Sequence, residues 1–182
     1  PASDLDAVRA MIGDGARVLI ERALAAIGRP SDPAAVEPLF SRFRERYAEV
    51  PCRRSEPYPG ARELLAHLRA AGFRLGLCTN KPQGVTDGLL RALDFDGYFD
   101  AVIGGDALPG IRKPDPAHLA AVLARLAVEP AAAVMIGDSR NDLLTARGLG
   151  VACILVSFGY TDTPASELGA DLEAWLGAEG AL

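Results

Sequence analysis

The sequence predicts an α/β fold, in which a parallel sheet is flanked by helices and preceded by a small all-helical module. The first observation is that short apolar runs alternate with helical stretches after residue 60, as in parallel sheets covered on both faces. The second is that every apolar pattern before residue 50 has helical spacing, and none resembles a strand. The third is that polar segments follow the apolar runs, at the edge where parallel sheets bind their ligands.

Composition and charge restrict the class of protein. Of the 182 residues, 49% are hydrophobic, which is typical of a globular chain, and the formal charge of −5 argues against binding to nucleic acid or an anionic membrane. No apolar run approaches the ~18 residues that span a bilayer, and no secretory signal is visible. Cys52, Cys78 and Cys153 lie too far apart for a metal or redox motif. We therefore expect a cytoplasmic protein with reduced thiols, and the sequence leaves its oligomeric state open.

Residues 4–48 are predicted to be helical throughout. Their apolar positions recur at helical spacing, with a break at Gly13–Asp14–Gly15 and a new helix start at Ser31-Asp32-Pro33. The proline-rich stretch that follows is expected to be a linker. We therefore predict a helical module over residues 1–55 and an α/β core over residues 56–182.

The core elements are predicted from apolar runs and the residues that interrupt them. Runs without alternation are typical of strands buried on both faces, and the glycines and prolines between them end or begin helices. These patterns predict helices at 61–71, 83–93, 116–126 and 142–149, and strands at 73–78, 101–103, 133–136 and 153–156. Residues 172–176 also have a helical pattern, so we expect a helix there.

Two segments carry side chains suited to a phosphoryl group. Thr79 and Asn80 follow the strand at 73–78, where a hydroxyl, an amide and the next helix N-terminus can donate hydrogen bonds to phosphate oxygens. The alternative is that both residues only shape a turn and cap a helix. Lys113 stands before two closely spaced prolines, so it is a well-held positive charge, although the same segment would also serve as a simple helix-entry loop.

A pair of carboxylates follows the strand at 133–136. Asp138 and Asp142 are spaced i and i+4, so both point to one site from the start of a helix. Such a pair suits Mg²⁺, which binds one or two carboxylates together with waters and phosphate oxygens. The alternative, a helix N-cap, accounts for one acid and leaves the second unexplained.

Three of these segments together resemble motifs II, III and IV of the haloacid dehalogenase (HAD) superfamily, in the same order: Thr79-Asn80-Lys81, Arg112-Lys113-Pro114-Asp115-Pro116 and Gly137-Asp138-Ser139-Arg140-Asn141-Asp142. The residues of these motifs are most similar to those of phosphoglycolate phosphatases. Two further segments also resemble these enzymes: Met11-Ile12-Gly13-Asp14-Gly15-Ala16 and Ser157-Phe158-Gly159-Tyr160-Thr161. The resemblance covers nearly the whole chain. It implies a Rossmann-like HAD core, with the helices of residues 4–48 as a cap over the substrate and Gly13 and Gly15 in the substrate-facing loop of that cap.

The resemblance also implies a role for each matching core residue. Thr79 would be catalytic by holding the transferring phosphoryl group, with Asn80 as its neighbour in substrate binding. Lys113 would be the catalytic lysine that contacts the phosphoryl group. Asp138 would be the catalytic carboxylate that ligates Mg²⁺, and Asp142 would be the second acid of the metal site.

One family motif has no counterpart in the sequence. The nucleophile of the superfamily is the first Asp of Asp-x-Asp-Gly-Thr, at the end of the first, central strand. Here Asp4-Leu5-Asp6 is followed by Ala7-Val8, with no apolar strand before it, so we expect Asp4 to cap a helix. The chain begins with Pro1, which suggests a processed chain or a fragment, and the missing motif would lie about thirty residues upstream. We expect this chain alone to form no aspartyl-phosphate.

These observations leave more than one function open. The first is a Mg²⁺-dependent phosphomonoesterase for a small phosphorylated metabolite, with the conversion of 2-phosphoglycolate to glycolate and phosphate as the leading candidate. The second is another enzyme of the superfamily, such as a dehalogenase or a sugar phosphomutase. A dehalogenase needs no metal, so the pair of carboxylates argues against it. The third is a catalytically inactive relative that binds phosphate or another protein.

Overall fold

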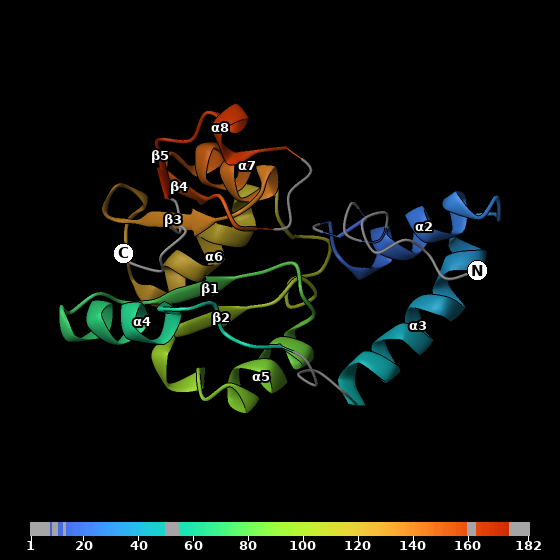
Figure 1. The fold of residues 1–182 in the computed structure, drawn as a ribbon, viewed down its shortest axis with the longest axis horizontal. Coiled ribbons are helices and arrows are strands. Elements are labelled where there is room, and N and C mark those ends of the chain that lie inside the picture. The colour runs from blue at the N-terminus through green and yellow to red at the C-terminus, as the bar shows by residue number, and fades with distance from the viewer. Residues whose placement is uncertain (1–7, 9–10, 13, 50–54, 160–162, 175–182) are drawn as a thin grey trace.

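The computed structural model describes residues 8, 11–12, 14–49, 55–159 and 163–174, and it contains two bodies of secondary structure (Figure 1). A helical module lies on one side, and an α/β core with two small parallel sheets lies on the other. Within these residues, no helix is long and apolar enough to cross a membrane. The α/β class predicted from the sequence is confirmed.

The core strands are all parallel to their partners. Strand β1 (Gly76–Cys78) pairs with β2 (Ala101–Ile103), and Cys78 lies opposite Ile103. The second sheet has the order β3-β4-β5, formed by β3 (Val134–Gly137), β4 (Ala152–Val156) and β5 (Leu172–Ala174). Since parallel strands align their carboxyl ends, the polar segments after β1 and β3 lie at one edge of the core.

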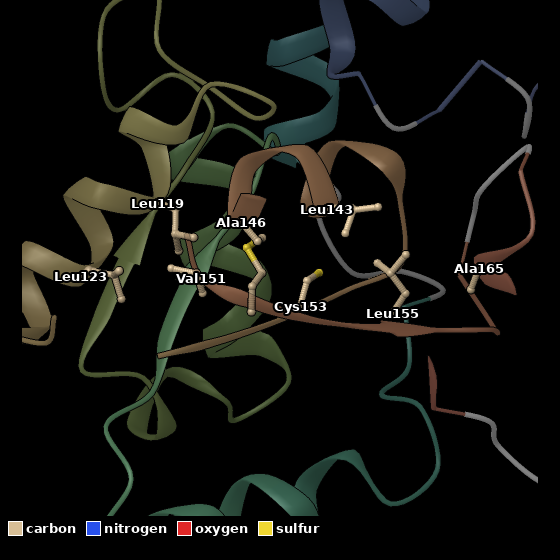
Figure 2. Packing of buried hydrophobic residues seen from close by; sticks show 9 residues of the cluster. Leu119, Leu123, Leu143, Ala146, Val151, Cys153, Leu155 and Ala165 are labelled. Atoms are coloured by element: carbon tan, nitrogen blue, oxygen red, sulfur yellow. The ribbon is translucent and has the colours of Figure 1, made fainter. Parts of the chain in front are cut away.

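The helices pack on these strands as the sequence patterns predict. They are α4 (Ala61–Ala70), α5 (Gln83–Ala92), α6 (Pro116–Leu126), α7 (Arg140–Leu149) and the short α8 (Ala165–Leu168). Helix α6 contacts β1, β2 and α7, so it joins the two sheets. The main apolar core lies between α6, α7, β3 and β4, where Leu119, Leu143 and Leu155 pack together (Figure 2).

A groove separates the two sheets. Among the described residues, β1 and β3 pair with no strand on the edges that face each other. The groove between them has a volume of about 400 Å³, and Gly76, Leu77 and Cys78 line it on one side and Val134, Met135 and Ile136 on the other. Val134 and Ile136 are 59% and 54% exposed. Strands β1 and β3 are therefore not paired with each other.

The helical module consists of α2 (Ala16–Ala26) and α3 (Pro33–Glu49) in the described part of the chain. The two helices have a small apolar core of their own, made by Ile20, Leu24 and Val36. The helix expected before residue 13 falls largely on residues outside the described part, and residues 50–54 of the linker also lie outside it. The boundary predicted at residue 55 stays a prediction.

The end of the chain differs from its sequence pattern. A helix was expected at 172–176, but residues 172–174 form strand β5, parallel to β4. Asp171 prepares this pairing, because its carboxylate accepts a hydrogen bond from the Cys153 amide at 2.8 Å and its own amide donates to the Cys153 carbonyl at 3.2 Å. An open edge of a sheet satisfies the backbone of a short segment better than an isolated helical turn does, so tertiary context overrides local propensity.

Candidate active site

A cavity of about 400 Å³ lies where the helical module meets the carboxyl ends of β1 and β3. The core contributes Thr79, Asn80, Lys81, Pro82, Lys113, Asp138, Ser139 and Asp142, and the module contributes Ile12, Gly15, Ala16, Leu19, Phe43 and Tyr47. The structure therefore brings the predicted residues Gly15, Thr79, Asn80, Lys113, Asp138 and Asp142 to one site. The predicted residue Gly13 lies outside the described residues.

The segment after β1 is held in place by backbone hydrogen bonds. The Thr79 amide donates to the Ile103 carbonyl at 3.1 Å, and the Thr79 hydroxyl accepts from the Lys81 amide at 3.1 Å. The hydroxyl still has its own proton to donate to an anion in the cavity. Asn80 makes a contact that its sequence context did not predict, because its side-chain amide donates to the Lys113 carbonyl at 2.9 Å. Asn80 thus fixes the loop that carries the lysine.

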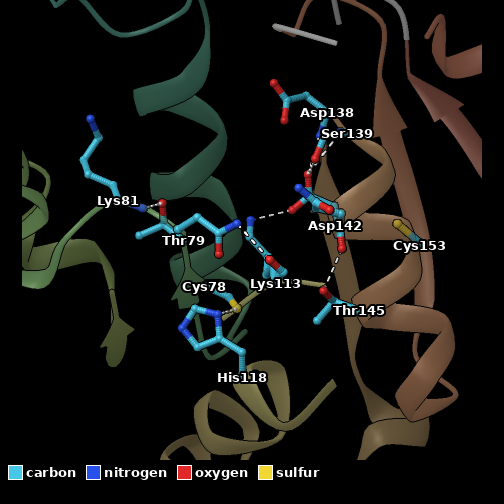
Figure 3. A network of polar contacts seen from close by, with 12 residues as sticks. Cys78, Thr79, Lys81, Lys113, His118, Asp138, Ser139, Asp142, Thr145 and Cys153 are labelled. Carbon is cyan, nitrogen blue, oxygen red and sulfur yellow. Dashed lines mark hydrogen bonds and ion pairs between the residues drawn. The ribbon is translucent and has the colours of Figure 1, made fainter. Parts of the chain in front are cut away.

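Lys113 and Asp142 form a buried ion pair. The Lys113 ammonium lies 2.5 Å from Asp142 Oδ1, and the two side chains are only 13% and 3% exposed (Figure 3). The peptide bond between Lys113 and Pro114 is cis. A positive charge held this firmly beside Thr79 is suited to offset the charge of a phosphoryl group.

The other oxygen of Asp142 closes the start of α7. Asp142 Oδ2 accepts hydrogen bonds from the Ser139 hydroxyl at 2.7 Å and from the Ser139 and Asp138 amides at 3.1 Å each. Ser139 and Asp142 form a capping box, so the N-cap alternative considered for this segment applies to Ser139. Burial opposes ionisation of Asp142, but the ion pair with Lys113 and these hydrogen bonds outweigh it and lower the pKa of the carboxyl.

Two glycines leave room for the carboxylates of Asp138 and Asp142, a role that the sequence patterns did not predict for either glycine. A Cβ atom on Gly137 would lie 2.3 Å from the Cβ of Asp142, and a Cβ on Gly159 would lie 2.1 Å from the Cβ of Asp138. Real Cβ atoms do not approach each other so closely, so any other residue would displace the acid. The resemblance at Ser157–Thr161 was the one sequence signal that pointed to this segment.

The chemistry of the donor set suits Mg²⁺ only in part. Asp138 presents a carboxylate to the cavity, and Mg²⁺ uses one or two protein carboxylates with waters and phosphate oxygens. In the described part of the chain no group of three or more His, Cys, Asp or Glu side chains is arranged to hold a metal. Both oxygens of Asp142 are engaged by protein donors, so direct ligation by Asp142 stays a prediction.

The module forms an apolar wall opposite these charges. Ile12, Leu19 and Phe43 line it. The two arginines of α2 pair with acids of the module itself. Arg17 lies 2.6 Å from Glu37, and Arg22 pairs with Asp14. These arginines therefore form ion pairs within the module and stabilise it.

Asp14 joins the module to the core. Its carboxylate accepts a hydrogen bond from the Asn141 side-chain amide at 2.7 Å, across 127 residues of sequence. This hydrogen bond is the main reason that the pKa of Asp14 is lowered, and the Arg22 guanidinium adds to the effect. The loop predicted to face the substrate thus also binds the first turn of α7.

Lys81 and Tyr47 were not among the predicted site residues. The Lys81 ammonium donates to the Tyr47 hydroxyl, and it lies 4.7 Å from the centre of the Tyr47 ring. One signal was available in the sequence, because Lys81 and Lys113 are the only lysines in the chain. The structure places both of them on the cavity.

The buried histidine beneath the site has a packing role. His118 is fully buried, with Nδ1 3.5 Å from Cys78 Sγ and Nε2 3.2 Å from the Gly104 carbonyl. Burial lowers the pKa of His118, so its ring is neutral and Nε2 carries the proton donated to Gly104. Burial also raises the pKa of the Cys78 thiol to about 11, which excludes a reactive thiolate.

Comparisons with known proteins agree with this geometry. A model of the haloacid dehalogenase-like hydrolases matches residues 2–150. The chain is 46% identical over 172 residues to the phosphoglycolate phosphatase of Caulobacter vibrioides, covering 94% of this chain and 72% of that protein. It is 42% identical to the phosphoglycolate phosphatase of Rhodospirillum rubrum, covering 96% of this chain and 77% of that protein. A solved structure of a predicted phosphoglycolate phosphatase from Haemophilus somnus 129PT superposes with a TM-score of 0.86 at 29% identity, covering 96% of this chain and 79% of that one.

Proposed function

The chain belongs to the haloacid dehalogenase-like hydrolases, and from this premise we propose that its cavity binds a small phosphorylated metabolite for Mg²⁺-dependent hydrolysis, with 2-phosphoglycolate as the first candidate. The observation that carries the proposal is the buried pair of Lys113 and Asp142 beside the Thr79 hydroxyl. A desolvated, preorganised ammonium next to a hydroxyl donor suits a group that carries negative charge on several oxygens.

Each core residue has a separate task in this proposal. Thr79 donates its hydroxyl proton to a phosphoryl oxygen and fixes the orientation of the group. Lys113 offsets the negative charge that the phosphoryl group and an attacking carboxylate bring together. Asp142 holds the Lys113 ammonium at 2.5 Å and keeps it charged, and Asn80 holds the backbone of the same loop at 2.9 Å.

Asp138 is the residue proposed to hold Mg²⁺. Its carboxylate lines the cavity, and Gly159 leaves the room that this side chain occupies. When bound, the metal supplies charge neutralisation to the phosphate oxygens and to the nucleophile. Asp142 is proposed to act indirectly, by accepting hydrogen bonds from the amides of Asp138 and Ser139 and so positioning the turn that carries Asp138.

The attacking group is proposed to come from a strand that occupies the groove between β1 and β3. A parallel strand there would end between Thr79 and Asp138, because these residues follow the two flanking strands. The sequence of 182 residues contains no Asp-x-Asp-Gly-Thr segment to supply it. We therefore propose that this chain alone stabilises the charge of a bound phosphate and hydrolyses no phosphomonoester.

A direct test compares this chain with a longer protein in which a strand ending in Asp-x-Asp-Gly-Thr precedes it. Release of phosphate from 2-phosphoglycolate, with and without Mg²⁺, is the measurement. We expect metal-dependent release from the longer protein and background release from the 182 residues. Release from the 182 residues alone would show that the chemistry lies elsewhere.

The same experiment separates the other candidate functions. A sugar phosphomutase would convert a hexose phosphate to its isomer with little net release of phosphate. A catalytically inactive relative would bind inorganic phosphate and show no turnover in either protein. The Asp138 carboxylate in the cavity argues against a metal-free dehalogenase.

A further inference from the structure

The two lysines of the chain line the same cavity but have different electrostatic partners. Lys113 is paired with the Asp142 carboxylate at 2.5 Å. Within the described residues, the Lys81 ammonium has no carboxylate at ion-pair distance, and the hydrogen bond that it donates goes to the neutral Tyr47 hydroxyl. In Figure 3 the Lys81 ammonium lies well apart from the Lys113–Asp142 pair. The cavity therefore contains a second positive charge that no anion of the described protein balances.

The position of Lys81 is fixed by its backbone. Its amide donates to the Thr79 hydroxyl at 3.1 Å, and its carbonyl accepts from the Gly105 amide at 2.9 Å. A Cβ atom on Gly105 would lie 2.4 Å from the Asn80 carbonyl oxygen, so only glycine permits this close approach of the two chain segments. The backbone of Lys81 is thus held as firmly as that of Thr79, the residue proposed to hold the phosphoryl group.

The surroundings of Lys81 leave it as the cationic group available to a second anion. Lys81 and Lys113 are the two cationic side chains that line the cavity within the described residues. The module contributes the apolar side chains of Ile12, Leu19 and Phe43, and its other lining residues, Gly15, Ala16 and Tyr47, offer only uncharged hydrogen-bond donors. The arginines of α2 are occupied by Glu37 and Asp14.

From this arrangement we propose that Lys81 is the specificity-determining residue of the site, which binds a second anionic group of the substrate, a carboxylate close to the phosphoryl group. The proposal rests on the proposed phosphatase function and names its substrate class: short phosphorylated carboxylic acids. The Tyr47 hydroxyl accepts from Lys81 and has one proton to donate to the same carboxylate. Because Tyr47 lies on α3, the substrate anion would contact the core and the module together.

The test is a binding comparison, which needs no nucleophile. Affinities of the 182-residue chain for 2-phosphoglycolate and for ethyl phosphate, which lacks the carboxylate, are measured by titration calorimetry. A charge-assisted hydrogen bond in a partly buried site predicts that Lys81→Met lowers the ratio of the two affinities about 10- to 100-fold. Lys81→Arg retains the charge and is expected to keep most of the preference. Arg91→Met, an exposed change of the same charge on α5, is the matched control and should leave the ratio unaltered.

Each outcome decides the inference. A wild-type chain that binds 2-phosphoglycolate no better than ethyl phosphate overturns it, and so does equal weakening of both ligands by Lys81→Met. Circular dichroism of each variant, together with the Lys81→Arg result, separates lost recognition from lost folding. Failure of the phosphatase proposal gives a different pattern, in which the carboxylate preference persists but the longer protein with the added strand releases no phosphate.

Discussion

The two walls of the cavity are built on different principles. The core wall contains a desolvated ion pair, in which the Asp142 side chain is 3% exposed and every oxygen has a donor. The module wall is apolar and open, and its residue Ile12 is 45% exposed. Preorganised charge requires a rigid, water-excluding core, whereas contact with the organic part of a ligand requires only a fitting surface. The preorganised charge therefore lies on the core, whereas the module contributes mainly apolar contact surface.

The attachments between the two bodies support this division. The described contacts include Asp14 with Asn141, Tyr47 with Lys81, and Arg44 with Asp106 at 3.7 Å. Arg44 and Asp106 are 53% and 44% exposed, and exposed pairs of this kind contribute little stability. The Arg44–Asp106 pair therefore contributes little to holding the module on the core, and the part-buried contacts of Asp14 and Tyr47 are the stronger attachments.

The largest effect is expected at the core wall, on catalysis. In a longer protein that carries the Asp-x-Asp-Gly-Thr strand, Lys113→Ala removes the preorganised charge and should lower turnover of 2-phosphoglycolate by ~10²–10³. Phosphate release under saturating substrate and Mg²⁺ is the measurement. Arg91→Ala, which removes an exposed positive charge, is the control. Turnover within a few fold of the parent protein would mean that Lys113 does not contact the phosphoryl group.

The next effect concerns the stability of the core wall. Asp142→Asn keeps the shape of the side chain but leaves the 13%-exposed Lys113 ammonium without its carboxylate. Breaking a buried pair from one side costs about 3 kcal/mol or more, which urea unfolding would detect as a lower free energy of unfolding. A loss below about 1 kcal/mol would mean that solvent compensates Lys113 and that the core wall is less rigid than its burial indicates.

A smaller effect is expected on metal binding. Asp138→Asn removes one anionic ligand of the proposed metal site. We expect the Mg²⁺ concentration needed for half-maximal activity of the longer protein to rise roughly tenfold, because even the loss of a residue that only hydrogen-bonds to a metal ligand typically weakens metal binding by that much. Asp115→Asn changes the same charge at the N-cap of α6 and serves as the control. An unchanged Mg²⁺ requirement would assign the metal to other residues.

The smallest effect is expected at the module. Asp14→Asn should lower the free energy of unfolding by less than about 1 kcal/mol at pH 7, because the Asp14 side chain is 36% exposed. The lowered pKa of Asp14 means that its contribution is present above the unfolded value of 3.8 and disappears as the pH falls through the lower folded value. Wild type and variant should therefore differ at neutral pH and converge below about pH 4 in urea unfolding. A difference as large as that of Asp142→Asn would contradict the division between the two walls.

Local patterns were sufficient where one segment determines its own structure. The limits of α6 were predicted to the residue, because Asp115 caps it through the Ala117 amide at 2.9 Å and Pro116 begins it. Strand β2 was likewise predicted at Ala101–Ile103. The helix predicted at residues 172–176 was wrong for the opposite reason, because β5 forms by pairing with the edge of β4.

Sequence patterns were sufficient to predict the parallel α/β order and the family, and they predicted that Thr79, Lys113, Asp138 and Asp142 would meet at one site, as the cavity lining confirms. Motif residues follow strand ends, and parallel strands bring those ends together whatever the details of packing. Which polar side chains pair with one another depends on the tertiary structure. The pairs Lys113–Asp142, Lys81–Tyr47 and Asn141–Asp14 join residues 29, 34 and 127 positions apart. Such partners are chosen by how helices and loops pack in three dimensions, and no periodicity along the chain records that choice.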